Sequence, residues 1–564
     1  MDLNIKNIIK ANNIIVEDIN QLLHNEGIEF NSRLDIIVDF INSKYYGKDI
    51  ATSTISDTVA DEIVKKLDIL VIDKNELFQK IFMFYCNKKT KINLDQFYTP
   101  FTIGQFMCKL MIPNKKLIDP ACGTGDLVIN YDGEITLWDI SSDVINICES
   151  NYKLNNKKYE IECINSINEY NKDNGKYDYC CLNPPFGSST VIKNKEVLDK
   201  YTLSKGKAKE EIGIIFIERA INLLKEDGII FIILPNGYLG NTAKNTKMLR
   251  EYLLSYKIIA VLEFPGNTFS RSGTGVSTSL LILQKTKTDT HHNIFIKKIN
   301  NIGYVLNKKN TPYKYKTESG KYVIENDKPI LDNDLVECYM QLLNYANNEN
   351  ISLINVQDNM GNAGNTLKDY EVMSYCDLDN NILDINRYLD RYTVLLKNLK
   401  DNNAKTISDY IKKTANGKFT IVNDMEYLYL DIKQITTPIY NKNNLIYGYD
   451  LPGRAKIKLK KYDIIVSKLK SNKNTFTIIL DDVDNIICSN GFALLRPKDY
   501  DSAIIIFANL FSNSFHTQHN ALCTGSIMES ISDADIKNIY IDQNIDIAKY
   551  VKIIEALTTI NKEL

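Results

Sequence analysis

The 564-residue sequence lacks several features that mark membrane, secreted and zinc-binding proteins. It has no long apolar run, and its first twenty residues mix acidic and polar positions among the apolar ones, which disfavours a signal peptide or a membrane anchor. Its eleven cysteines include no C-x-x-C pair, which disfavours both a zinc site and a disulfide framework. We therefore expect a protein of the reducing cytoplasm without membrane contact.

Clustered metal ligands and nuclease-like carboxylates are also lacking. The adjacent His291 and His292 lie in a polar stretch without acidic or thiolate neighbours, so we expect no metal site there. Asp73 and Glu76 do not have the spacing of a nuclease carboxylate pair. Because the net charge is only −2, a nucleic-acid partner would require a local basic surface.

Hydrophobic patterning divides the chain into regions of different character. Residues 1–93 show helical spacing and predict a helical domain. Apolar runs alternate with helical segments over 94–290, which predicts an α/β domain with a mostly parallel sheet. Residues 291–400 are less regular and are assigned as a connecting region. Short strands with polar turns over 401–530 predict an α+β domain, and 531–564 predicts a closing helix.

The stretch LIDPACGTGDL at 117–127 places two glycines directly after a predicted strand. The strand ends at Asp119, and Gly123 and Gly125 allow a tight turn in which a ligand can approach backbone N–H groups. The spacing differs from G-x-G-x-x-G, so a dinucleotide fingerprint fits poorly. A purely structural turn is the alternative.

The following strand, ITLWDI, ends at Asp139. A carboxylate at the end of a second strand can accept hydrogen bonds from both hydroxyls of a ribose. The alternative is a helix cap, because DISSDV has the composition of a good capping sequence.

A second candidate site lies in CCLNPPFGSST at 180–190. A strand over YDYCCL must stop here, because Pro184 and Pro185 have no backbone N–H. The Asn183 side-chain oxygen and the Pro184 carbonyl would accept the two N–H bonds of an exocyclic amine and favour the pyramidal form that has a free lone pair. Phe186 offers a face on which a ring can stack. An ordinary turn is again the alternative.

Three motifs, QFYTP at 96–100, DPACGTG and NPPF, occur in this order and carry a family resemblance. They resemble the motifs of gamma-class S-adenosylmethionine-dependent DNA methyltransferases that act on the N6 amine of adenine, and most of all the modification subunits of Type I restriction-modification systems. The likeness spans roughly 90–285. It implies a Rossmann-like methyltransferase sheet, S-adenosylmethionine as methyl donor, and adenine methylation in a specific duplex DNA sequence by base flipping.

Carried over position by position, the resemblance implies two sets of site residues. The cofactor-binding set is Tyr98, Thr99, Pro100, Asp119, Ala121, Gly123, Gly125, Asp139 and Asn165. The catalytic set is Asn183, Pro184, Pro185 and Phe186. Asp95 stands where the family usually has Gly, and Asn165 where it usually has Asp. These departures leave open a non-catalytic DNA-recognition module.

The carboxyl-terminal region carries a second resemblance. LDINRYLDRY, LKKYDIIVSKLK, GFALLRP and TGSIMESISDADIKNIYI resemble one half of a Type I specificity subunit. This implies a target-recognition domain fused to the modification domain, with a homodimer or a separate restriction subunit as possible partners beside double-stranded DNA.

Basic residues in this region are candidate phosphate contacts. Their alternate spacing in RAKIKLKKYD would put four of them on one side of a strand. A solvated face is the alternative, and a further lysine cluster, Lys193 to Lys209, follows NPPF. The DNA-binding candidates are Arg454, Lys456, Lys458, Lys460, Lys468 and Lys470.

One rival function lies within the enzymes. Release-factor glutamine methyltransferases also use an N-P-P motif on an amide nitrogen, so a protein-glutamine or RNA amino-methyltransferase is an alternative. The chain length and the specificity-like region disfavour it.

Overall fold

The structure is a computed structural model, and it forms two compact units, 1–383 and 384–564, each of which is described by itself. No helix in the described ranges has both the length and the apolar character needed to cross a membrane. The described residues are 2–47, 55–70, 76–81, 84–85, 99–185, 190–270, 275–287, 292–307, 312–326, 328–352, 354–355, 370–413, 419–471, 474–482 and 484–563.

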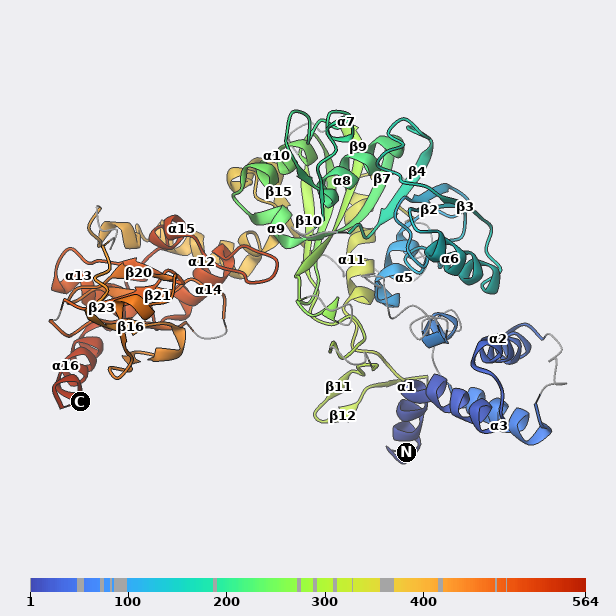
Figure 1. The fold of residues 1–564 in the computed structure, drawn as a ribbon, viewed down its shortest axis with the longest axis horizontal. Helices are drawn as coiled ribbons and strands as arrows, with labels where there is room; N and C mark the ends of the chain where they lie inside the picture. The colour runs from blue at the N-terminus through green and yellow to red at the C-terminus, as the bar shows by residue number, and fades with distance from the viewer. Residues whose placement is uncertain are drawn as a thin grey trace. The chain divides into compact units, whose positions relative to one another are not determined.

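The first unit begins with amphipathic helices, as the sequence predicts. They are α1 (Asp2–Asn25), α2 (Phe30–Tyr46) and α3 (Asp57–Asp68) (Figure 1). Apolar residues at helical spacing, among them Ile19 and Leu23, face a shared core. Burial of these stripes against one another stabilises the helices, since most helical stability in proteins comes from the packing of an amphipathic face.

A nine-stranded sheet forms the centre of the first unit (Figure 1). Its order is β15-β10-β8-β9-β7-β4-β1-β2-β3. The strands are β1 (Lys116–Asp119), β2 (Glu134–Asp139), β3 (Tyr159–Cys163), β4 (Tyr177–Leu182), β7 (Leu224–Pro235), β8 (Tyr256–Glu263), β9 (Thr278–Lys287), β10 (Asn293–Lys298) and β15 (Glu371–Ser374).

The sheet confirms the predicted α/β class but is more mixed than the sequence pattern suggests. The pairs from β3 through β7 are parallel, whereas β9 runs antiparallel to both β7 and β8. The connection from β8 to β9, residues 264–277, contains no crossover helix among its described residues. Without such a crossover, β9 can pair with its chain neighbour only in the antiparallel direction.

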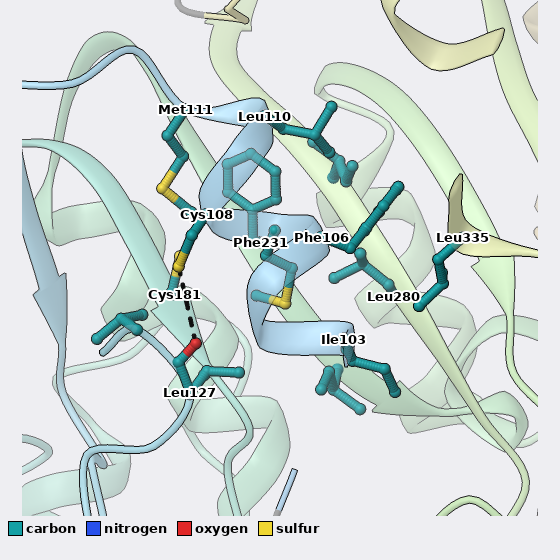
Figure 2. Packing of buried hydrophobic residues seen from close by; sticks show 14 of the residues in the cluster. Ile103, Phe106, Cys108, Leu110, Met111, Leu127, Cys181, Phe231, Leu280 and Leu335 are labelled. Atoms are coloured by element: carbon teal, nitrogen blue, oxygen red, sulfur yellow. Dashed lines mark hydrogen bonds between the residues drawn. The ribbon is translucent and has the colours of Figure 1, made fainter. Parts of the chain in front are cut away.

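Helices cover both faces of this sheet. One face packs on α5, α6 and α11, and Figure 2 shows α5 residues Phe106 and Leu110 beside Phe231 of β7 and Leu280 of β9. The other face packs on α8 and α10. The helices are α5 (Phe101–Leu110), α6 (Ser142–Leu154), α8 (Ile212–Leu223), α9 (Asn236–Gly240), α10 (Lys244–Leu253) and α11 (Leu335–Asn348).

Coverage on both faces explains the apolar run YDYCCL. Successive strand residues point to opposite faces, so Cys180 and Cys181 are both fully buried. All ten cysteines in the described ranges are free thiols. Small elements complete this unit: β5 (Val191–Ile192), α7 (Lys195–Leu198), β6 (Glu210–Glu211), β11 (Thr317–Glu318), β12 (Lys321–Tyr322), β13 (Ile324–Glu325) and β14 (Lys328–Pro329).

The second unit has the predicted α+β character. One sheet has the order β19-β16-β23-β20 and another has the order β22-β21-β24. Its strands are β16 (Glu426–Leu430), β17 (Ile435–Thr436), β18 (Ile439–Tyr440), β19 (Leu445–Tyr447), β20 (Ala455–Lys458), β21 (Ile464–Ser467), β22 (Phe476–Ile478), β23 (Ile486–Ser489) and β24 (Phe492–Leu495). Its helices are α12 (Asp390–Asp401), α13 (Tyr500–Asn509), α14 (Asn513–Leu522), α15 (Asp533–Lys537) and α16 (Ile547–Glu563).

The boundary between the units falls inside the predicted connecting region 291–400. From that region, β10, β15 and α11 join the core of the first unit. The finer predicted boundaries, at residues 93, 290, 400 and 530, stay predictions.

Candidate active site

The glycine loop after β1 lies at the carboxyl edge of the sheet. Gly123 and Gly125 adopt φ angles of 55° and 78°, a region that favours glycine. A Cβ on Gly125 would lie 2.5 Å from the Tyr152 ring and 2.6 Å from Cys148 Sγ, so this glycine allows close packing on α6. A Cβ on Gly123 would meet no atom within 4 Å, so its backbone faces open space. Gly123 is therefore the glycine that a ligand can approach.

Asp139, at the end of β2, fixes this loop. Its carboxylate accepts hydrogen bonds from Gly123 N and Ser141 N, both at 3.0 Å. The helix cap of α6 is Ser141, whose hydroxyl accepts from Val144 N. Asp139 is therefore not the N-cap residue of α6; one of its carboxylate oxygens accepts from the glycine loop and the other from Ser141.

A pocket of about 260 Å³ opens beside the loop. This volume is close to the lower end of the range for small-molecule sites, about 300–1,000 Å³. Segments from seven parts of the chain meet in it. Its lining residues are Thr99, Asp119, Pro120, Ala121, Cys122, Gly123, Thr124, Asp126, Leu127, Asp139, Ile140, Ile164, Asn165, Ser166, Ile167, Asn183, Pro185, Ile192, Ile212 and Phe216.

Both candidate motifs thus contribute to one pocket. Asn183 follows β4, and its Nδ2 donates to Thr99 Oγ1 at 3.3 Å. Pro185 lines the pocket, whereas Pro184 is buried and does not. Pro100 is the N-cap residue of α5, and its carbonyl accepts from Ile103 N at 2.9 Å. The structure therefore brings Thr99 and Asn183 together although 84 positions separate them.

Several predicted residues are not covered by the structure. Tyr98 and Phe186 from the site sets lie outside the described residues, and so do Asp73, Asp95 and His291. Their predicted roles stay predictions.

Buried carboxyl groups give the pocket an acidic character. Asp119 is 1% exposed and accepts from Ala121 N at 3.1 Å. Burial holds the pKa of Asp119 well above its ordinary value, and the neighbouring Asp139 and Asp126 raise it further. Burial also raises the pKa of Asp126, although Thr124 Oγ1 donates to it at 2.7 Å. A cationic ligand would favour the ionised forms of these carboxyls, so the pocket suits a ligand with positive charge.

The raised pKa of Asp119 leads to a prediction for the ligand-free protein. Because the folded state holds this proton more tightly than the unfolded state, the stability contribution is complete below the unfolded pKa, about 3.9, and is lost as the pH rises through the folded pKa. We expect Asp119→Asn, which keeps an acceptor for Ala121 N, to raise the melting temperature increasingly from pH 5 to pH 8. Thermal unfolding of both proteins across this range measures it.

The same substitution is expected to weaken the binding of a cationic ligand. Loss of one charged partner typically costs about 1.5–3 kcal/mol, so the Kd should rise by about 10- to 100-fold. Stabilisation without weaker binding would contradict the assignment of Asp119 to the ligand.

The loop after β3 is held by a buried arginine that the sequence reasoning missed. Arg219 of α8 is fully buried, and its Nε donates to Ser166 O at 2.8 Å. Its Nη2 donates to Glu169 O at 2.9 Å and to Lys172 O at 2.6 Å. Ser166 Oγ in turn donates to Pro120 O at 2.9 Å, which ties this loop to the glycine loop.

The Asn165 side-chain oxygen accepts hydrogen bonds within this loop. Its Oδ1 accepts from Ile167 N and Asn168 N, both at 3.2 Å. The oxygen therefore already has two donors, and the side-chain NH₂ is the better candidate for a ligand contact. An NH₂ group would donate to a ring nitrogen instead of accepting from an amine.

The sequence reasoning also missed the apolar wall of the pocket. Ile140 is 68% exposed although it directly follows a buried strand, and Ile164, Ile212 and Phe216 lie in the same lining. The one available signal was Ile140 itself, an isoleucine in the polar sequence between β2 and α6. Such a wall suits a planar ring.

Four of the six predicted phosphate contacts of the second unit have acidic partners. Arg454 pairs with Asp431 at 3.1 Å, Lys458 with Asp484 at 3.6 Å and Lys468 with Asp533 at 2.7 Å. Lys470 pairs with Glu529.

The register of these basic residues also differs from the prediction. Strand β20 ends at Lys458 and has an irregular register between Ala455 and Ile457, so Lys460 does not continue an alternating face. The expectation that four residues share one side of a strand is therefore wrong for Lys460. The phosphate contacts themselves stay a prediction.

Comparison with known proteins gives a family match for part of the first unit. Residues 74–325 match the family described as N-6 DNA Methylase. The match contains the glycine loop, Asp139 and the NPPF turn, and it confirms the predicted class, adenine-specific DNA methyltransferase, at the level of the family.

Individual relatives are distant. The chain is 24% identical over 311 residues to the Type I restriction enzyme MpnII methylase subunit of Mycoplasma pneumoniae, a match that covers 46% of this chain and 54% of that protein. It is 27% identical to the Type II methyltransferase M.AccI of Acinetobacter calcoaceticus, over 33% of this chain and 36% of that one. The chain thus spans about half, or less, of the length of these relatives.

Solved structures give weak likenesses. The type IIG restriction endonuclease BpuSI matches with a TM-score of 0.46 and 12% identity, over 97% of this chain and 72% of that one. The Type I methyltransferase subunit from Streptococcus thermophilus matches with a TM-score of 0.41 and 16% identity, over 66% and 80%.

The N-6 DNA Methylase family implies S-adenosylmethionine as cofactor. The residues present fit this group. The pocket has an open backbone approach at Gly123, an acceptor carboxylate at Asp139 and the buried carboxyl of Asp119. Hydroxyl donors and a positively charged sulfonium and ammonium would find complementary partners there.

Proposed function

We propose that this protein transfers a methyl group from S-adenosylmethionine to the N6 amine of adenine in a specific double-stranded DNA sequence. The observation that carries the proposal is that Asn183 and Asp139 line the same pocket of about 260 Å³. This pocket then contains one acceptor for an exocyclic amine and one acceptor for the ribose hydroxyls of a nucleoside.

The cofactor supplies an electrophilic methyl group, and the protein's own residues hold and align both reactants. Asp139 accepts from the ribose hydroxyls, the Asn165 NH₂ donates to a ring nitrogen, and Ile140 covers one face of the adenine ring. Asp119 balances the positive charge of the methionine end, and Thr99 borders it.

The target amine is held on the other side. Asn183 Oδ1 and the Pro184 carbonyl accept its two N–H bonds, so that the nitrogen lone pair is directed at the methyl carbon. Phe186 stacks on the base. Because a base inside a duplex cannot reach this pocket, adenine is flipped out, at a cost of a few kcal/mol. The N6 proton leaves to solvent after transfer.

The second unit is proposed to recognise the target sequence as half of a specificity subunit. Its sequence resemblance supports this role, and two copies would read a two-part site, with α16 available for pairing. A homodimer and a separate restriction subunit are the proposed partners.

Methyl transfer from radiolabelled S-adenosylmethionine tests the proposal. We expect label in duplex DNA, recovered after nuclease digestion as N6-methyladenine, with none in RNA or protein. Label that survives nuclease and disappears with protease would favour the protein-glutamine alternative, and label that disappears with ribonuclease would favour the RNA alternative. Duplex binding without cofactor binding would favour a recognition module.

A further inference from the structure

Residues 190–211, called the lysine segment here, connect the NPPF stretch to α8. A short hairpin of β5 and β6 closes its base, where Val191 pairs with Glu211. The segment contains six lysines, and five of them are exposed. The exposed lysines are Lys193, Lys195, Lys200, Lys205 and Lys209.

Buried side chains hold the lysine segment in place. The Glu218 carboxylate of α8 accepts from Thr202 N at 2.7 Å and from Leu203 N at 2.9 Å. Tyr201 OH donates to Ile167 O at 2.6 Å, and Tyr238 OH donates to Glu211 at 2.8 Å. These anchors tie the segment to α8, to the loop after β3 and to α9, so the lysines project from a defined backbone.

The charge of the segment is not compensated locally. Glu210 is buried and pairs with Lys207, and Glu211 accepts from Tyr238. Only Glu196 and Asp199 are exposed acids of the segment. Among the described residues no carboxylate lies within 4 Å of the five exposed lysines. This differs from the second unit, where Lys458, Lys468 and Lys470 are ion-paired.

The lysine segment also borders the pocket. Ile192 in its hairpin and Ile212 directly after it line the same cavity as Asn183. Lys244 and Lys247 of α10 are exposed as well, and Figure 1 shows α7 and α10 at the same end of the sheet. Exposed positive charge therefore lies on the segment whose Ile192 lines the pocket.

We propose that the lysine segment binds the phosphate backbone of duplex DNA on either side of the flipped adenine. This inference rests on the proposed function and deepens it by naming the surface that holds the DNA. Each lysine–phosphate contact releases condensed counterions, so affinity gained in this way depends on salt and not on sequence.

A triple variant, Lys193→Gln, Lys195→Gln and Lys205→Gln, tests the proposal. With a 30-base-pair duplex, the slope of log K against log salt concentration should become shallower by about 2–3, because each contact contributes about 0.9. The Kd for S-adenosylmethionine should stay unchanged. The matched control is Lys6→Gln, Lys10→Gln and Lys65→Gln on the N-terminal helices, which should leave the slope as it is.

Two outcomes would overturn the inference. One is an unchanged salt slope in the lysine-segment variant. The other is that the wild-type protein binds single-stranded RNA more tightly than duplex DNA and that the triple variant loses this preference. Absence of methyl transfer would reject the proposed function alone, since the salt slope is measured by binding. A circular-dichroism melt of the variant separates lost contacts from lost folding.

Discussion

Replacing Asn183 with alanine is expected to lower kcat for DNA methylation by about 10²–10³-fold, the size seen when one preorganised polar group is removed from an active site. The amide oxygen is the proposed acceptor for an N6 proton, and without it the amine stays planar and weakly nucleophilic. Its Nδ2 donates to Thr99 Oγ1 at 3.3 Å, which fixes the orientation of the amide. Single-turnover methylation at saturating DNA and cofactor measures the effect.

Cofactor binding by the Asn183→Ala variant should remain close to that of the wild type. The matched control is Asn146→Ala, at an exposed position on α6, which should keep full activity. Equal loss of cofactor binding and methyl transfer would instead mean that Asn183 supports the pocket and does not hold the target amine.

Replacing Asp139 with alanine is expected to weaken S-adenosylmethionine binding by on the order of 10²–10⁴-fold. Two hydrogen bonds from ribose to a carboxylate would be lost, at about 1.5–3 kcal/mol each. The substitution also removes the acceptor for Gly123 N and Ser141 N, so the glycine loop loses its tie to β2. Isothermal titration calorimetry gives the Kd.

Two companion variants sharpen this experiment. Asp139→Asn keeps one acceptor oxygen and should show an intermediate loss, whereas Asp143→Ala, exposed in the first turn of α6, should bind normally. If Asp139→Ala bound the cofactor as tightly as the wild type, the ribose assignment would have to be abandoned.

Much of the fold follows from local sequence patterns. The runs that form β1, β2 and β4 are short, apolar and closed by Asp, Gly or Pro, so their length and their ends are encoded in adjacent residues. Because parallel strands end at one edge of a sheet, Asp119, Asp139 and Asn183 come together in one pocket once these strands pair. Their roles toward cofactor and base remain predictions.

These local patterns do not predict contacts between residues that are far apart in the sequence. Arg219 clamps the loop after β3, yet in sequence it is one more residue of an apolar helix. In the same way, RAKIKLKKYD looks like uncompensated charge, although Asp431 and Asp484 supply partners from elsewhere in the chain. The direction of β9 also depended on which strands became its neighbours.

The sequence alone determined where strands stop and which residues stand at their ends, because backbone conformation and hydrophobic period are properties of neighbouring residues. Only the tertiary structure decided which charges are neutralised, which wall of the pocket is apolar and which lysines of the lysine segment stay unpaired. Those properties depend on distances between segments far apart in the chain, and burial and charge pairing arise only when the fold sets those distances.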